Sequence, residues 1–437
     1  MTNSLRLLSC HLLIATLAVW CHHAAAQTQW SIADFQTDRL LNRFDTNRNE
    51  KLDGSEKACV RDAFGGIDVP MLPVKAFEYA NTALPQYISA SELALLDDTT
   101  LDNHLTNPGA TLGRVLFYDR QLSRNNSVGC AACHEQRYGF ADPRRLSQGF
   151  EGGMTTRNSM SLANLRYSNI RGAKAGFFWD ERAATLEDQA LIPIQDRIEM
   201  GMTLEELQVK LQNLPYYPAL FEAAFGSNKI TSDRVAKALA QFVRSLQSWD
   251  AKYDRAMGDA EGHTAGNFAV FSDEENLGKS LFFEGINGVA EFGCAHCHVP
   301  PTFGMPQSLN NGLELKYADS GLGALNRPSN DLFTPSNDGK FKAPSLRNVA
   351  LSAPYMHDGR LKTLADVVLH YSRNVQSHEN LGLEFEDQQT DQPRGFKFTD
   401  KQQAALVAFL RTLTDERFIS DPKFGDPFIR LAEIQSD

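Results

Sequence analysis

The chain has 437 residues, of which 42% are hydrophobic and 22% charged, as in an ordinary globular protein. At about 150 residues per domain, this length favours two or three domains and excludes a mini-protein held together only by disulfides. The 43 Lys and Arg against 54 Asp and Glu give a formal charge of −11, which disfavours nucleic acid or an anionic membrane as a partner. Small molecules or cationic protein surfaces are the expected partners.

The chain begins with an export signal. Residues 12–20 are apolar, Arg6 precedes them, and the alanines at 24–26 follow them. The apolar run is too short to span a bilayer, and this order of basic, apolar and small residues is typical of a cleaved secretory signal over residues 1–26. The alternative is a short anchor. We therefore expect a mature protein without a membrane span, exported to a compartment such as the bacterial periplasm.

Residues 27–95 form an amino-terminal extension with a calcium-binding pattern between two expected helices, one ending at Phe44 and one running through Val60. The pattern resembles an EF-hand loop, except that Glu50 replaces the glycine of the sharp turn, at a cost of about 1 kcal/mol. The alternative is a polar loop that caps the second helix. The expected ligands are Asp45, Asn47, Asn49, Lys51, Asp53 and Glu56.

A weak internal repeat organises the rest of the chain. Leu-Gly, Leu-Phe and Cys-x-x-Cys-His occur in this order from Leu112 and again from Leu277, with Gly-to-Cys spacings of 17 and 16. Two copies this far apart do not form a solenoid, so we expect two homologous domains, 96–262 and 263–437. A polar, glycine-rich stretch at 258–266 is the expected linker between them.

The predicted elements are mostly helices. Apolar residues recur at three- and four-residue intervals from Ser232 to Trp249, and again after Thr399, which predicts one closing helix in each copy. Further helical stretches cover 186–194 and 204–211. Because strand patterns are few, the expected fold class is mainly α.

Each copy carries the attachment signature of c-type haem. In this signature two cysteines form thioether bonds to the porphyrin and the adjacent histidine binds the iron. The sequence therefore predicts two covalently bound haem c groups in two cytochrome c-like domains in tandem behind a helical extension. The residues are Cys130, Cys133 and His134 for the first haem, and Cys294, Cys297 and His298 for the second.

Other uses of these cysteines fit the sequence less well. The paired motifs of a structural zinc site usually lie about 15–20 residues apart, much closer than these two pairs. A disulfide redox motif would need one pair on a thioredoxin-like turn. Signal cleavage would remove Cys10 and Cys21 and leave Cys59 as an odd thiol, which we expect to be buried and inert.

The segment between the two haem motifs distinguishes an enzyme from a small electron carrier. This segment, and the chain after the second haem motif, carry a series of spaced motifs: Arg157-Asn158, Phe178 to Ala183, Leu186 to Ala190, Glu199 to Gly201, Lys342 to Val349 and Ala353 to Gly359. With these motifs the sequence resembles the bacterial di-haem cytochrome c peroxidase and MauG family over about residues 105–415. Glu181 replaces the family's usual glycine, and residues 159–161 replace its common Ser/Ala-Pro-Thr.

The resemblance implies a peroxide-binding site at the first haem. Glu199 matches the family's acid-base carboxylate, which can move a proton between the oxygens of a peroxide, and Gln189 matches its pocket partner. Trp179 matches the aromatic residue between the two haems. Without the resemblance, Glu199 reads as a solvated charge at a helix end and Trp179 as a core tryptophan.

The resemblance also implies a calcium site that bridges the domains. Asn164 and the carbonyl oxygens of Ser352 and Pro354 match its ligands, and oxygen ligands suit this hard ion. His357 matches a histidine near the second haem, to which we assign no role.

Two departures from the peroxidase pattern concern the sixth position of each iron. Peroxidases that need reductive activation cap the first haem with a loop histidine, but no histidine lies between His134 and His263. We therefore expect the first haem to be open. At the second haem, the usual distal methionine is replaced by Tyr371, as in MauG-type members.

Helical periodicity places Tyr371 on one face with Leu364, Val367 and Val368, whereas His370 lies about 100° around the helix. A phenolate is a hard anionic ligand that favours the ferric and higher states. The alternative is a buried tyrosine bonded to a carbonyl. Rival ligands for this haem are Met305, Met356 and His370.

We therefore expect a periplasmic oxidoreductase that splits hydrogen peroxide at the first haem and passes oxidising equivalents through Trp179 to the second. MauG-like oxidation of a partner protein is the favoured outcome. The alternative is a cytochrome c peroxidase supplied with electrons by an electron-donor protein such as a small c-type cytochrome or a copper protein. A non-catalytic di-haem electron carrier is a third alternative, disfavoured by Trp179, Gln189 and Glu199.

Overall fold

A computed structural model describes residues 30–431, apart from gaps at 171–172, 175, 287–292, 306, 328–335, 388–389 and 391. The expected signal segment, 1–26, lies outside the described residues. None of the described helices is both long and apolar enough to cross a membrane.

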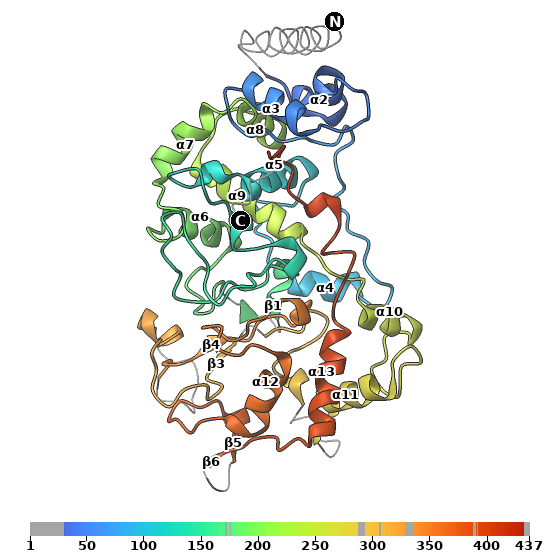
Figure 1. Cartoon of the computed structure of the whole chain (residues 1–437). Coiled ribbons are helices and arrows are strands. Elements are labelled where there is room, and N and C mark those ends of the chain that lie inside the picture. Colours follow the sequence, from blue (N-terminus) through green and yellow to red (C-terminus); the bar gives the residue numbers. More distant parts are fainter. Residues whose placement is uncertain are drawn as a thin grey trace, which may run out of the picture.

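The described chain is mainly helical, as predicted (Figure 1). Its short strands pair antiparallel as β1–β2, β3–β4 and β5–β6. The helices are α2 (Thr37–Phe44), α3 (Gly54–Ala63), α4 (Ala90–Leu96), α5 (Asn107–Tyr118), α6 (Leu186–Gln195), α7 (Leu204–Gln212), α8 (Tyr217–Phe225), α9 (Ser232–Ser245), α10 (Lys252–Asp259), α11 (Asp273–Glu284), α12 (Leu364–Leu369) and α13 (Asp400–Arg411). The strands are β1 (Asn169–Ile170), β2 (Ala173–Lys174), β3 (Ser308–Leu309), β4 (Phe341–Lys342), β5 (Glu386–Asp387) and β6 (Gln392–Pro393).

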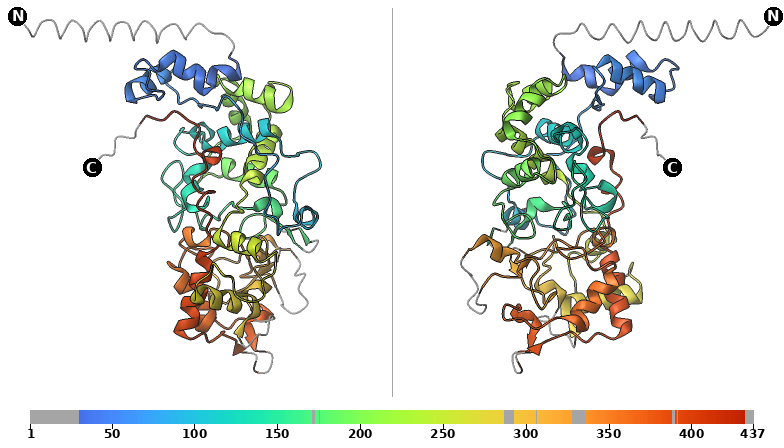
Figure 2. Two further views of the ribbon diagram at one scale, coloured as in Figure 1. Left: turned by 90° about the vertical axis from the view of Figure 1, so that its right-hand side faces the viewer. Right: turned by 60° about the vertical axis from the view of Figure 1, so that its left-hand side comes forward.

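The molecule is elongated. Helices α2 and α3 lie at one end, α5 to α9 in the middle, and α10 to α13 at the other end (Figures 1 and 2). The buried apolar side chains form two large clusters, one spanning the extension and the middle and one in the far half. Each half of the molecule therefore has its own core, and the first core also includes side chains of the extension.

The sequence repeat corresponds to a pair of crossed helices in each half. Helix α5 packs against α9, and α11 packs against α13. A Cβ added to Gly113 would lie 1.9 Å from the Ala238 carbonyl oxygen, and one added to Gly278 would lie 1.9 Å from that of Ala405. Only glycine permits this approach, so the repeated Leu-Gly marks the helix crossing in each half.

The helix predictions are confirmed for α6, α7, α9 and α13, with two differences at the boundaries. Helix α9 ends at Ser245, so Trp249 lies beyond the helix, where it is buried. Helix α10 runs through Asp259, so the first two residues of the expected linker are helical and only residues 260–266 are irregular.

The carboxy-terminal segment returns to the first half after α13 (Figure 1). Phe418, Phe424 and Phe428 belong to the first core, and the Tyr118 hydroxyl donates to the Phe424 carbonyl at 2.7 Å. The expected second domain, 263–437, therefore ends with a segment that packs on the first half.

Candidate active site

The two Cys-x-x-Cys-His motifs have the same local structure. Each begins with a short 3-10 turn, at Cys130–Ala132 and Cys294–His296. His134 Nδ1 lies 2.9 Å from the Phe140 carbonyl oxygen, and His298 Nδ1 lies 3.1 Å from that of Phe303. Because Nδ1–H donates to a carbonyl, Nε2 is left as the free nitrogen, the usual arrangement of a histidine that binds a metal. Burial lowers the pKa of both histidines, which favours the neutral form needed for ligation.

The cysteines fit covalent haem attachment better than their alternative uses. Burial raises the pKa of Cys130 to about 12 and that of Cys294 to about 11, the opposite of a reactive redox thiol. Among the described residues, no three His, Cys, Asp or Glu side chains come together as a metal site, so the two pairs do not form one zinc centre. Cys59 is buried, as expected, and is disulfide-bonded in the full-length chain; that it is the odd thiol of a chain cleaved after residue 26 stays a prediction. The four motif cysteines are free.

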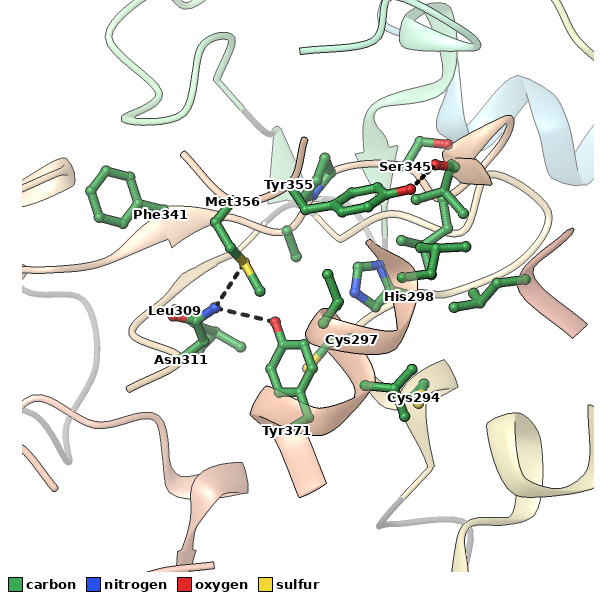
Figure 3. Close-up of a pocket in the computed structure, with 18 of the residues that line it drawn as sticks. Cys294, Cys297, His298, Leu309, Asn311, Phe341, Ser345, Tyr355, Met356 and Tyr371 are labelled. Atoms are coloured by element: carbon green, nitrogen blue, oxygen red, sulfur yellow. Dashed lines mark hydrogen bonds between the residues drawn. The ribbon is translucent and has the colours of Figure 1, made fainter. Parts of the chain in front are cut away.

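The second haem motif opens into a largely apolar pocket (Figure 3). His298 lines it together with Leu364, Val367, Val368 and Tyr371, the helix face that the sequence predicted. The pocket is therefore walled by the motif that would attach a haem and by a helix that presents apolar side chains and one phenol to it.

Tyr371 lies in a π-helical turn, His370–Asn374, that follows α12. Such turns are rare and are often found at functional sites. Its hydroxyl oxygen lies 3.2 Å from Asn311 Nδ2, so it accepts a bond from an amide, and among the described residues it donates to no carbonyl. Burial raises the pKa of Tyr371 to about 12, although the Asn311 donor opposes the rise. The phenol is therefore held within the pocket with an oxygen lone pair still available.

The rival ligands of the second haem separate clearly. His370 Nε2 lies 3.0 Å from the Asn311 carbonyl oxygen. Neither His370 nor Met305 lines the pocket. Met356 does line it, and its sulfur lies 3.6 Å from Asn311 Nδ2. Of Tyr371 and its three rivals, only Tyr371 and Met356 therefore line the pocket that also contains His298.

Trp179 lies where the two halves meet. Its indole N–H donates to the Asn158 carbonyl at 2.8 Å, and its side chain lines the pocket of the second haem motif. His357 lines the same pocket, and its ring stacks on Phe341 with centroids 3.6 Å apart. The structure thus brings Trp179, His357 and Tyr371 together around one cavity.

Glu199 lies near the first haem motif, after α6 in the sequence. It follows α6 in a turn in which its backbone N–H donates to the Asp196 carboxylate at 3.1 Å. Burial, together with the nearby charge of Asp196, raises the pKa of Glu199 to about 7, and Arg182 opposes the rise. Burial, and to a smaller extent the Glu199 charge, raise the pKa of Cys130 and Cys133, so the carboxyl group lies near the attachment site of the first haem. A carboxyl with a pKa near neutrality can both take and return a proton.

Gln189 lies half-buried on α6. Within the described chain, its side chain forms no hydrogen bond with Glu199 or with the first haem motif. Its expected role as pocket partner therefore stays a prediction.

Asn164 has a structural role that the sequence did not reveal. Its amide oxygen accepts a hydrogen bond from the Ser248 backbone N–H at 3.0 Å. In the second half, the Asn348 amide oxygen accepts one from the Asp415 backbone N–H at 2.8 Å. Both asparagines adopt left-handed backbone conformations, with φ of 60° and 61°. Each joins a loop of its half to the segment after the closing helix. The expected calcium ligation by Asn164, Ser352 and Pro354 stays a prediction.

The loop between α2 and α3 satisfies both interpretations of its sequence in part. Glu50 takes the left-handed conformation of the EF-hand glycine, with φ of 63°, and its N–H donates to Asp45 at 2.8 Å. Asp53 and Glu56 cap α3, and Glu56 accepts the Thr46 N–H at 2.7 Å. The capping role is therefore confirmed, and calcium binding stays a prediction.

Sequence reasoning left Arg157 without a role and did not single out Asn311. Arg157 forms ion pairs with Asp180 and with Asp319, both at 2.6 Å, and so links the two halves. The position of Arg157 in the Arg-Asn motif was the sequence feature that could have indicated a role. Asn311 carried none, because an Asn-Asn-Gly sequence reads as an ordinary turn.

Comparison with known proteins identifies the family. Residues 107–262 and 272–418 match the family model described as di-haem cytochrome c peroxidase, so the chain belongs to this family. Two haem groups and a haem-dependent peroxidase or oxidoreductase activity follow for this protein.

Individual relatives cover most of the chain. The methylamine utilization protein MauG of Methylophilus methylotrophus is 31% identical over 346 residues, 78% of this chain and 94% of the relative. The cytochrome c551 peroxidase of Nitrosomonas europaea is 30% identical over 323 residues, 73% of this chain and 83% of the relative.

Solved structures share the fold. A MauG-like protein associated with microbial copper homeostasis is 31% identical, with a TM-score of 0.63 over 79% of this chain and 99% of that one. The di-haem peroxidase BthA of Burkholderia thailandensis is 22% identical, with a TM-score of 0.56 over 74% of this chain and 91% of that one. The second likeness concerns the fold alone.

Proposed function

We propose that this family member uses hydrogen peroxide at the first haem to oxidise a side chain of a partner protein, through the second haem. The observation that supports this choice is Tyr371, whose hydroxyl lies in the pocket of the second haem motif without a bond to a carbonyl. A phenolate ligand stabilises the more oxidised states of iron, and such a centre is better suited to storing oxidising equivalents than to receiving electrons from a carrier.

The chain's own residues supply the proton and electron routes. The haems, when bound, supply the redox chemistry. Reduction of one hydrogen peroxide to two water molecules takes two electrons and two protons. We assign to Glu199 the transfer of the proton between the two peroxide oxygens, with Gln189 orienting the bound peroxide. Trp179, at the meeting of the two halves, carries the electron between the haem centres.

The partner in this proposal is a protein with an oxidisable tyrosine or tryptophan. Oxidation of that side chain would give up the two electrons that the peroxide takes. Supply of the same electrons by a small electron-carrier protein, as in a cytochrome c peroxidase, is the second candidate, and the cytochrome c551 peroxidase relatives favour it.

Several further expectations belong to this proposal. They are export to the periplasm by the segment 1–26, the division into 27–95, 96–262 and 263–437, and calcium at the inter-domain and EF-hand-like sites. Calcium titration followed by thermal unfolding of the holoprotein tests the last, since an ion that binds only the folded state raises the melting temperature.

The deciding experiment adds hydrogen peroxide to the fully ferric holoprotein. Our proposal expects peroxide to be consumed at once, because no loop histidine is present to cap the first haem. A requirement for prior one-electron reduction would support the cytochrome c peroxidase alternative and contradict the open first haem. An absence of turnover under both conditions would support an electron carrier.

A further inference from the structure

Three side chains that could bind the iron of the second haem all contact one residue, Asn311. Its Nδ2 lies 3.2 Å from the Tyr371 hydroxyl oxygen and 3.6 Å from the Met356 sulfur (Figure 3). Its backbone carbonyl oxygen lies 3.0 Å from His370 Nε2. Asn311 therefore contacts Tyr371 and two of its three rival ligands, Met356 and His370.

The donors and acceptors of these contacts are well matched. A primary amide nitrogen carries two N–H groups, one for the Tyr371 oxygen and one for the Met356 sulfur. A phenolate is a strong acceptor, so the bond to Tyr371 is strengthened when that oxygen is ionised, as it is on iron. A thioether sulfur is only a weak acceptor, so the second bond holds Met356 in place at little cost.

The backbone fixes Asn311 in position. The following residue, Gly312, has a φ of 66°, and its N–H donates to the Asn310 side chain at 2.9 Å. A Cβ at Gly312 would lie 2.6 Å from a Val375 methyl group. The His370 ring donates to the Asn311 carbonyl from the other side, which leaves that Nε2 protonated and unavailable to a metal.

We propose that Asn311 selects Tyr371 as the distal ligand of the second haem by bonding its oxygen and by holding Met356 and His370 away from the iron. Asn311 is thus a positioning residue. The inference rests on the proposed function, because both take Tyr371 as the ligand of the second haem. The identity of the axial ligand and its outer hydrogen bonds set the potential of a haem iron. Replacement of the Tyr371 phenolate by the Met356 thioether as ligand would raise that potential. The second haem would then be better suited to accepting electrons than to holding oxidising equivalents.

The test compares Asn311→Leu and Asn311→Asp with the parent holoprotein, by near-infrared absorption and electron paramagnetic resonance of the ferric second haem and by its reduction potential. Both variants remove the two N–H donors at nearly constant volume and keep the backbone carbonyl that holds His370. In each variant we expect part of the second haem to show the spectrum of a methionine-ligated iron, and the reduction potential of that haem to be higher than in the parent. The double variant Asn311→Leu with Met356→Leu should lose the methionine signature, and Met356→Leu alone should keep the parent spectrum.

The variants separate this inference from the proposed function. Parent-like spectra and potential in both Asn311 variants, with normal haem content and circular dichroism, would overturn the selection role. Tyr371→Phe should abolish the phenolate signature of the parent. If Tyr371→Phe left the parent spectrum unchanged, Tyr371 would not be the ligand and the basis of the proposed function would fail with it. If the Asn311 variants kept the parent spectrum and potential while Tyr371→Phe lost the phenolate signature, the proposed function would stand.

Discussion

The carbonyl oxygen of Trp179 accepts a 2.8 Å hydrogen bond from the backbone N–H of Lys342, so the loop that carries the indole is bonded to the half that carries the second haem. The Lys342 side chain turns back to the same loop, and its ammonium group donates to the Gly176 carbonyl at 2.7 Å. Lys342 is buried at this junction, and burial lowers the pKa of its ammonium group to about 8. Trp179 is therefore fixed at the boundary by backbone contacts that do not depend on its ring.

Replacement of Trp179 by phenylalanine tests the indole as a route between the haems. The backbone contacts remain, so the fold is kept, while the more easily oxidised ring is lost. We expect the second haem to be oxidised at least tenfold more slowly after peroxide is added, as followed by stopped-flow absorption of each haem. Trp249→Phe is the matched control, since Trp249 is also buried and its N–H bonds only to Gln247. Equal rates in the two variants would contradict the relay.

The sequence predicted those features that depend on the spacing of residue types. The Cys-x-x-Cys-His motifs, the closing helices and the helix face that ends at Tyr371 follow from local chemistry and periodicity, and the structure contains all of them. The repeated Leu-Gly was visible as a repeat, but its place at the helix crossings was not predicted. Glu181 adds a physical reason for the family glycine, because its φ is 55° and lies in the left-handed region.

Features set by long-range contacts could not be predicted in this way. Asn311 meets Tyr371 and Met356 across 60 and 45 positions of sequence, and nothing within its own turn marks it. Asn164 offers an oxygen that suits calcium, yet its partner in the fold is the Ser248 backbone, 84 residues away. The return of the carboxy-terminal segment to the first core is likewise decided by packing and not by periodicity.

Glu199→Gln removes the group expected to move the peroxide proton. General acid-base catalysis contributes about 10²–10⁴-fold, so we expect peroxide consumption by the ferric holoprotein to fall by that factor. Haem content should be unchanged, because Glu199 does not belong to the attachment motif. Glu205→Gln, on an exposed position of α7, is the control and should match the parent. Peroxide decay that is the same in both variants would remove Glu199 from the mechanism.

The pH dependence of the first step follows from the same carboxyl group. Burial raises the pKa of Glu199 to about 7, and only the ionised carboxylate can accept the peroxide proton. The rate should therefore be low at pH 5, rise through about pH 7 and level off above it. In Glu199→Gln this inflection should disappear, whereas Glu205→Gln should keep it. An inflection that persists in Glu199→Gln would assign the titration to another group.

Gly113→Ala tests whether the close crossing of α5 and α9 holds the first half together. The new Cβ would lie 1.9 Å from the Ala238 carbonyl oxygen and 2.8 Å from the Phe242 Cβ, so the two helix backbones would have to move apart. Overpacking of a buried core costs about 1–3 kcal/mol or more, and backbone atoms cannot yield as a side chain can, so we expect about 3 kcal/mol. Gly258→Ala on α10 meets nothing within 4 Å and should stabilise by about 0.5–1 kcal/mol, since alanine favours a helix. Thermal unfolding of the holoproteins measures both, and equal melting temperatures would contradict the role of this crossing.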